Sequence, residues 1–188
     1  IFARNWEGTE QLRRYLYYQL IHSMRKADRI DIIVSFLMES GVKMLLEELK
    51  KAMKRGAQVR ILTGNYLGIT QPSALYLIKH ELGELVDLRF YNERNRSFHP
   101  KSYIFHYADH SEIYIGSSNI SRSALTSGIE WNYRFSSHRD PENYEKFYRT
   151  FEDLFQNHSI VIDDKELKRY SKTWHRPAAS KDLDRYDN

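Results

Sequence analysis

The chain has 188 residues, a length that suits one globular domain with a single hydrophobic core. Hydrophobic residues make up 41% and charged residues 29%, a composition that excludes a disordered or fibrous protein. No cysteine is present, which excludes disulfides and thiolate metal sites, and no apolar run approaches the roughly 20 residues that span a bilayer. We therefore expect a cytoplasmic protein with no membrane partner.

The first half of the sequence alternates helical and strand patterns. Thr9 is placed to cap a helix that reaches Lys26, and Gly56 is placed to end the second helix. The expected elements are a helix over 9–26, a strand over 29–36, a helix over 40–55, a strand over 57–63, a helix over 72–82 and a strand over 85–91. Strand, helix and strand in this order imply right-handed crossovers between parallel strands, so the fold class is α/β.

The second half changes to consecutive strands and one long helix. After a polar loop over 92–97, strand patterns cover 98–106, 112–115 and 129–135, so the sheet is expected to be mixed and flanked by helices on both faces. An aromatic stripe from Tyr144 to Phe155 predicts an amphipathic closing helix that begins near Asp140. The predicted domain spans 1–160, and 161–188 are interpreted as a charged tail or linker.

Residues suited to phosphate chemistry concentrate between 98 and 135. His99 and Lys101 lie two apart on a predicted strand, so their side chains leave the same face as a nucleophile and a fixed cation. The next strand ends in a Gly-Ser-Ser-Asn segment, in which Ser117 and Asn119 are hydrogen-bond donors. Glu130 opens the following strand, and its carboxylate is suited to hold an imidazole in one tautomer.

This set matches what phosphodiester cleavage without a metal requires. Lys101, Ser117 and Asn119 are suited to neutralise and orient a phosphate while His99 attacks phosphorus in line to form a phosphohistidine. The leaving alkoxide needs a proton, and one imidazole cannot act on opposite sides of one phosphorus. A second histidine is therefore required, although the chain carries the motif once. No cofactor and no metal site are expected.

The motif resembles the signature of the phospholipase D superfamily, H-x-K followed by G-S-x-N, here His99 to Lys101 and Gly116 to Asn119. The resemblance implies that two half-sites meet, one histidine attacking and the other acting as general acid, and that His99, Lys101, Ser117, Asn119 and Glu130 take the catalytic roles. With a single motif, the active form is expected to be a homodimer with the site across its two-fold interface.

A closer resemblance extends over nearly the whole chain. The runs ADRIDIIVSF, VRILTGNYLG, HPKSYIF and GSSNISRSALTSGIEWNYRF are similar to the phospholipase D-like nuclease domain that accompanies bacterial superfamily 2 helicases, with kinship to nuclease domains of some metal-independent restriction enzymes. This resemblance implies DNA as substrate and a helicase in the same longer chain. An opening without Met and a net charge of +4 fit that expectation.

One position departs from the family pattern. The lipases of the superfamily place Asp seven residues after the motif histidine, where this chain has His106. We interpret this difference as an argument against lipid hydrolysis. The alternative to a nuclease is a nucleic-acid-binding or dimerising module of a helicase with little or no turnover.

Several side chains near the motif are candidates for binding substrate. Arginines in loops can contact phosphates, and an aromatic ring can stack on a base, although solvation or packing explains each such residue equally well on its own. The candidates are Arg94, Arg96, Ser118, Arg122, Trp131 and Arg134.

Overall fold

The computed structural model describes residues 15–93 and 95–178. Within this part of the chain, the backbone forms a mixed sheet of seven strands in the order β6-β5-β4-β1-β2-β3-β7. The strands are β1 (Arg29–Val34), β2 (Gln58–Thr63), β3 (Val86–Tyr91), β4 (Lys101–His106), β5 (Ser111–Gly116), β6 (Asn132–Ser136) and β7 (Ser159–Val161). The helices are α2 (Leu16–Met24), α3 (Glu39–Lys54), α4 (Pro72–Leu82), α5 (Arg122–Leu125), α6 (Pro141–Asn157) and α7 (Asp164–Thr173), with short 3-10 turns η1 (Tyr66–Gly68) and η2 (Gly83–Leu85).

The parallel part of the sheet places three strand ends at one edge. β1 pairs with β2 and β2 with β3 in parallel, through crossovers that contain α3 and α4. β4 pairs antiparallel with β1, and Val34 at the end of β1 is opposite Lys101 at the start of β4. The carboxyl ends of β1, β2 and β3 therefore lie at the same end of the sheet as the first residue of β4, and the end of β1 lies next to it.

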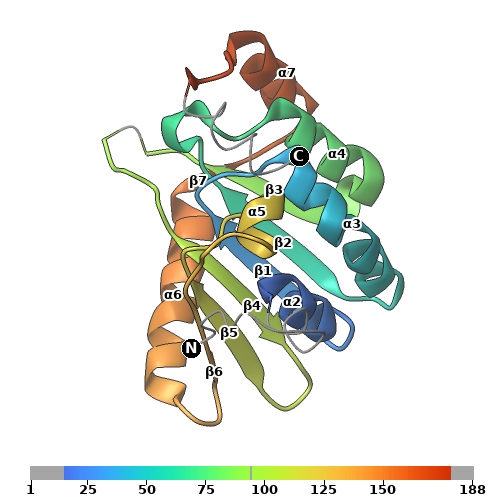
Figure 1. Ribbon diagram of the computed structural model, residues 1–188, viewed down its shortest axis with the longest axis vertical. Helices are drawn as coiled ribbons and strands as arrows, with labels where there is room; N and C mark the ends of the chain where they lie inside the picture. Colours follow the sequence, from blue (N-terminus) through green and yellow to red (C-terminus); the bar gives the residue numbers. More distant parts are fainter. Residues whose placement is uncertain (1–14, 94, 179–188) are drawn as a thin grey trace.

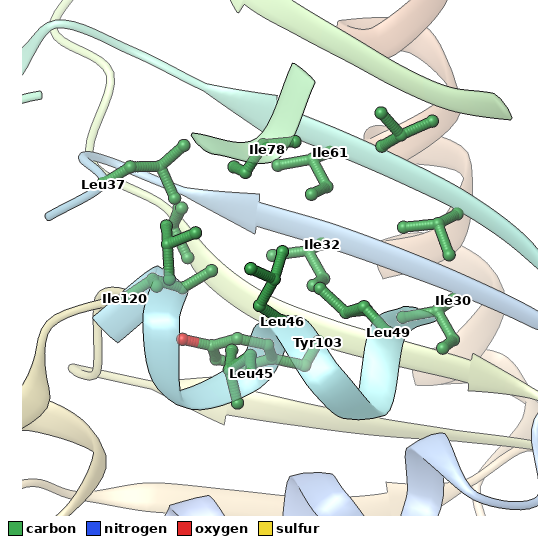
Figure 2. Close-up of a cluster of buried hydrophobic side chains, with 14 of the residues drawn as sticks. Ile30, Ile32, Leu37, Leu45, Leu46, Leu49, Ile61, Ile78, Tyr103 and Ile120 are labelled. Carbon is green, nitrogen blue, oxygen red and sulfur yellow. The ribbon is translucent and has the colours of Figure 1, made fainter. Parts of the chain in front are cut away.

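Helices cover both faces of the sheet, as the sequence predicts (Figure 1). On one face, residues of α2, α3 and α4 pack on the strands in the large apolar cluster that Figure 2 shows in part, with Leu46 and Leu49 of α3 beside Ile32 of β1. On the other face, Phe151 and Phe155 of α6 pack in a second cluster on the sheet. The α/β class and the mixed sheet are confirmed.

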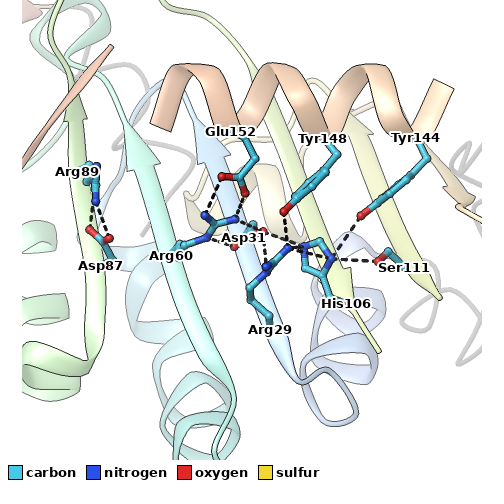
Figure 3. Close-up of polar contacts among 10 residues, drawn as sticks. All are labelled: Arg29, Asp31, Arg60, Asp87, Arg89, His106, Ser111, Tyr144, Tyr148 and Glu152. Atoms are coloured by element: carbon cyan, nitrogen blue, oxygen red, sulfur yellow. Dashed lines mark hydrogen bonds and ion pairs between the residues drawn. The ribbon is translucent and has the colours of Figure 1, made fainter. Parts of the chain in front are cut away.

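A buried ionic network helps to fix α6 on the sheet (Figure 3). Asp31 of β1 is fully buried and accepts hydrogen bonds from Arg60 Nε at 2.6 Å and Arg60 Nη2 at 2.7 Å. His106 Nε2 lies 2.8 Å from the same carboxylate, and Glu152 of α6 accepts from Arg60 Nη1 at 3.2 Å. The residue that departs from the family pattern is therefore part of this network, at the end of β4 opposite the motif.

The chain beyond residue 160 differs from the expected tail. Ile162 is fully buried, Leu167 of α7 is 8% exposed, and both belong to the large apolar cluster. β7 adds to the edge of the sheet beside β3. The charged composition misled the prediction because α7 is amphipathic and needs few apolar residues to pack. The part of the predicted first helix before residue 15 lies outside the described residues.

Candidate active site

His99 lies in the loop just before β4 rather than on a strand. The strand predicted over 98–106 begins at Lys101, because Phe98 turns into the second apolar cluster instead of pairing. The Phe98 ring stacks on Tyr91 with centroids 4.4 Å apart and covers Gly64, where a Cβ would lie 2.6 Å from it. This packing carries the chain over the end of the sheet and leaves His99 at the surface.

Lys101 nevertheless brings its cation to the imidazole, as the motif predicts. Its Nζ lies 2.9 Å from His99 Nδ1 and 3.1 Å from Nε2, and it donates to the His99 carbonyl at 2.9 Å and to Ser35 Oγ at 3.0 Å. Partial burial and the charge of Lys101 lower the pKa of His99, which favours the neutral imidazole. Burial also lowers the pKa of Lys101, and the nearby Glu130 carboxylate opposes that shift.

Asn119 is held by the backbone that follows β1. It is 5% exposed, and its Oδ1 accepts from the backbone N–H of Ser35 at 2.9 Å and of Phe36 at 3.2 Å. The amide orientation is thereby fixed, so that Nδ2 is the group that Asn119 can present to an anion. Ser35 joins the two motif elements, since its hydroxyl meets Lys101 and its N–H meets Asn119.

Ser117 and Glu130 form a second cluster between the ends of β5 and β6. Ser117 Oγ donates to the Glu130 carboxylate and accepts from the Trp131 N–H at 3.0 Å. Glu130 precedes β6 instead of opening it, and it bonds Ser117 rather than the imidazole of His99. Gly116 is needed for this junction, because a Cβ there would lie 2.0 Å from the Trp131 carbonyl oxygen.

The residues predicted to bind substrate are distributed unevenly. Ser118 is fully buried and accepts from Asn132 Nδ2 at 2.9 Å, and the Arg134 guanidinium lies over the Tyr114 ring at 5.9 Å. The contact of Ser118 gives this residue a structural role, whereas Arg134 is exposed. Four candidates are exposed near the motif, and Arg94 lies outside the described residues. The exposed candidates are Arg96, Arg122, Trp131 and Arg134.

Two residues of the site escaped the sequence analysis. The ring of Tyr66 packs against the His99 ring with centroids 4.5 Å apart, and Ser35 bonds the motif lysine and is fully buried. For Ser35 a signal was available, since a serine that directly follows a buried parallel strand lies at the edge where such sheets place their sites. For Tyr66 there was none, because its contact depends on the path of two loops.

The other seven histidines have polar partners away from His99. These contacts are His22 with Lys26, His80 with Glu81, His106 with Asp31, His110 and His138 with Asp109, His158 with Glu93, and His175 with the Thr173 carbonyl. Among the described residues, His99 is therefore the one histidine whose imidazole lies beside a buried lysine, Lys101.

A cavity of about 270 Å³ borders the half-site on the side of α6. Its walls are mostly apolar and include Phe151 and Leu154 of α6 together with His99 and Gly116. The Ser102 hydroxyl, which is buried in its wall, has no hydrogen-bond partner among the described residues.

Among the described residues, no group of three or more His, Cys, Asp or Glu side chains is arranged to hold a metal ion. In the same part of the chain, no helix has the length and apolar character that a bilayer crossing requires.

Comparison with solved structures shows the same fold in several proteins. NucT from Helicobacter pylori matches 77% of this chain and 89% of its own at 15% identity, with a TM-score of 0.59. Polyphosphate kinase from Porphyromonas gingivalis matches 80% of this chain and 22% of its own at 13% identity, with a TM-score of 0.58. Phosphatidylserine synthase from Haemophilus influenzae matches 88% of this chain and 41% of its own at 15% identity, with a TM-score of 0.55.

Comparison of the sequence with protein families identifies one family. No curated protein matches the chain, but the family model described as "Cardiolipin synthase, PLD-like domain" matches residues 18–158. This range contains both motif elements, Ser35 and all of α6. The chain therefore belongs to the phospholipase D superfamily, as a single α/β domain with one H-x-K and one G-S-x-N element.

Proposed function

We propose that the chain is a metal-independent nuclease, which cleaves DNA through a phosphohistidine on His99 in a site that two copies complete. The observation that carries the proposal is that the imidazole of His99 lies beside Lys101 Nζ. Ser35 bonds both Lys101 and Asn119, which fixes the Asn119 amide near the same site. A neutral ring nitrogen, a buried cation and an oriented amide are the groups that attack on a phosphodiester requires.

In the proposed first step, a nitrogen of His99 forms a bond to phosphorus as the bond to the leaving oxygen breaks. Lys101 and the Nδ2 group of Asn119 stabilise the charge on the non-bridging oxygens. Ser117 is oriented by Glu130 and adds a hydroxyl near the end of β5. Water then cleaves the phosphorus–nitrogen bond and regenerates the imidazole.

The departing alkoxide takes a proton from a second imidazole, which we assign to His99 of another copy. Support comes from the distribution of the other histidines, which bond elsewhere, and from the surface beside the half-site. Edge strand β6 has no partner on its outer side among the described strands, and it carries Tyr133, 54% exposed, next to Trp131, 72% exposed. An exposed edge with large aromatic side chains is a surface that a second copy can cover.

DNA as the substrate rests on the sequence resemblance, and the structure adds support. Arg96 and Arg122 are exposed close to the motif in the chain, and the net charge of +4 favours a polyanion. The fold likeness to NucT extends over most of that protein, which supports a working unit of about this size. A helicase in the same longer chain is proposed on the sequence runs alone.

The test is cutting of plasmid and single-stranded DNA in excess EDTA by wild-type protein and by His99→Asn. We expect cutting that EDTA leaves unchanged and that His99→Asn abolishes. His175→Asn is the matched control, because His175 is exposed and bonds only a local carbonyl. Loss of cutting in EDTA, or wild-type rates with His99→Asn, would show the mechanism to be wrong. Salt-sensitive DNA binding without cutting at any pH would favour a binding module.

The shared site is tested by mixing. Wild-type and His99→Asn chains with different tags are unfolded together in equal amounts and refolded. Random pairing leaves ~25% of dimers with two intact histidines, so activity is expected to fall to about a quarter of that of undiluted wild type. A mixture with half the activity of undiluted wild type would show that each copy works alone.

A further inference from the structure

The imidazole of His99 lies between two groups from different parts of the chain. Lys101 Nζ is within hydrogen-bond distance of its ring nitrogens, and the Tyr66 ring packs on it with centroids 4.5 Å apart and planes tilted by 58°. The side chain sits on a surface loop, where it would otherwise rotate about two bonds. The aromatic contact therefore restricts the direction in which its nitrogens point.

The loop that carries Tyr66 has an unfavourable backbone conformation. Leu67 adopts φ +52°, in the left-handed region that residues with a Cβ rarely occupy, and Gly68 follows with φ +72°. Such a conformation is strained and persists only where the surroundings hold it. The position of Tyr66 thus depends on contacts from outside its own loop.

The last helix supplies those contacts. Trp174, which follows α7, donates from Nε1 to the Gly68 carbonyl at 2.7 Å. The hydroxyl of Tyr170 on α7 lies 2.7 Å from both Asn65 Oδ1 and the Thr70 carbonyl, one at each end of the loop. The Tyr170 ring itself packs on Phe90 of β3, with centroids 5.0 Å apart, so the donor is anchored to the sheet.

We propose that Tyr66 is a positioning residue for His99 and that α7, through Tyr170 and Trp174, holds the 65–70 loop in place for it. The inference rests on the proposed function for the role of His99 in catalysis. In-line attack on phosphorus tolerates little misalignment, so loss of this support lowers the rate of attack more than the binding of DNA. The segment that composition predicts to be a tail then becomes part of the catalytic domain.

The kinetic test compares kcat and KM on DNA for Tyr66→Ala, Tyr66→Phe and Trp174→Phe. We expect Tyr66→Ala to lower kcat roughly 10- to 100-fold with KM changed less than about threefold, and Tyr66→Phe to restore most of the rate because the ring makes the contact. Trp174→Phe keeps an aromatic ring but loses the donor, and is expected to lower kcat several-fold. Lys165→Ala, an exposed change on α7, is the control and is expected to leave both constants unchanged.

A second measurement reads His99 directly, whether or not the protein cuts DNA. The histidine ring signals are titrated by NMR, with His99 assigned from the spectrum of His99→Asn. The groups that face this ring are Lys101 Nζ and the Tyr66 ring, with Glu130 acting on Lys101. Because partial burial lowers the pKa of His99, Tyr66→Ala is expected to raise it, and Trp174→Phe to move it the same way.

The two measurements separate failure of this inference from failure of the proposed function. A raised His99 pKa in Tyr66→Ala and Trp174→Phe supports the positioning role even if no substrate is cut. An unchanged His99 titration, with melting temperatures close to wild type, overturns it. A fall in kcat no larger than the fall in the fraction of folded protein, measured by circular dichroism under the assay conditions, overturns it as well.

Discussion

Replacing Asp31 by Asn removes the centre of the network beneath α6. The carboxylate accepts two hydrogen bonds from Arg60 and lies 2.8 Å from His106 Nε2, with no exposed surface. Its loss leaves Glu152 as the remaining counterion of Arg60 among the described residues, and breaking a buried ion pair in this way costs about 3–5 kcal/mol. For a chain of this size, the melting temperature is expected to fall by roughly 6–20 °C.

The assay is urea unfolding followed by circular dichroism at pH 7, with Asp87→Asn as the matched control. Asp87 also pairs with an arginine in the sheet, through Arg89 Nε at 2.8 Å, but its side chain is 38% exposed (Figure 3). The control is expected to lose less than about 1 kcal/mol. Equal losses in the two variants would refute the argument that burial sets the cost.

The same network predicts how the difference in unfolding free energy between wild type and Asp31→Asn changes with pH. Burial alone raises the pKa of Asp31, but hydrogen bonds from Arg60 and His106 outweigh it and hold the pKa below its ordinary value. A lowered folded pKa gives stability that is present above the unfolded pKa, near 3.8, and lost as pH falls through the folded value. The gap between wild type and Asp31→Asn is therefore expected to narrow below about pH 4.

Three further predictions concern the half-site. Asn119→Asp keeps an acceptor for the two backbone N–H groups but loses the Nδ2 donor, so cutting is expected to fall at least about tenfold in an activity assay while the melting temperature changes little. Ser102→Ala removes a buried hydroxyl without a partner among the described residues and is expected to raise stability by up to about 1 kcal/mol in urea unfolding; a loss would reveal a partner. Burial and Lys101 lower the pKa of His99, so the single-turnover cutting rate is expected to fall with acid only below about pH 6.5. A fall in the rate that begins above this pH would contradict the contact between His99 and Lys101.

Much of the fold follows from local patterns in the sequence. The helix from Pro72 to Leu82 has the predicted bounds, since Pro begins it and Gly83 ends it with φ +68°. The motif residues were found because their order and spacing carry information that single residues lack. His99 and Lys101 meet although the strand begins three residues later than predicted, because the family motif depends on their spacing and not on the strand bounds.

The sequence failed where a residue's role depends on distant contacts. Ser118 looked like a phosphate donor but is committed to Asn132, and Glu130 bonds Ser117. Tyr170 meets Asn65 across 105 positions of sequence, a contact that no local pattern indicates. Composition made α7 resemble a tail, because a short helix that packs one face on the hydrophobic core can carry charged residues on all its other faces.

The central claim is a bond between an imidazole nitrogen and phosphorus. Reactions of wild-type protein with DNA are stopped in alkali after a few milliseconds, digested and analysed by mass spectrometry for a modified peptide. The account predicts a nucleotide phosphate on His99, formed in EDTA and missing in His99→Asn. Turnover with no adduct at any time, or an adduct on another residue, would contradict it.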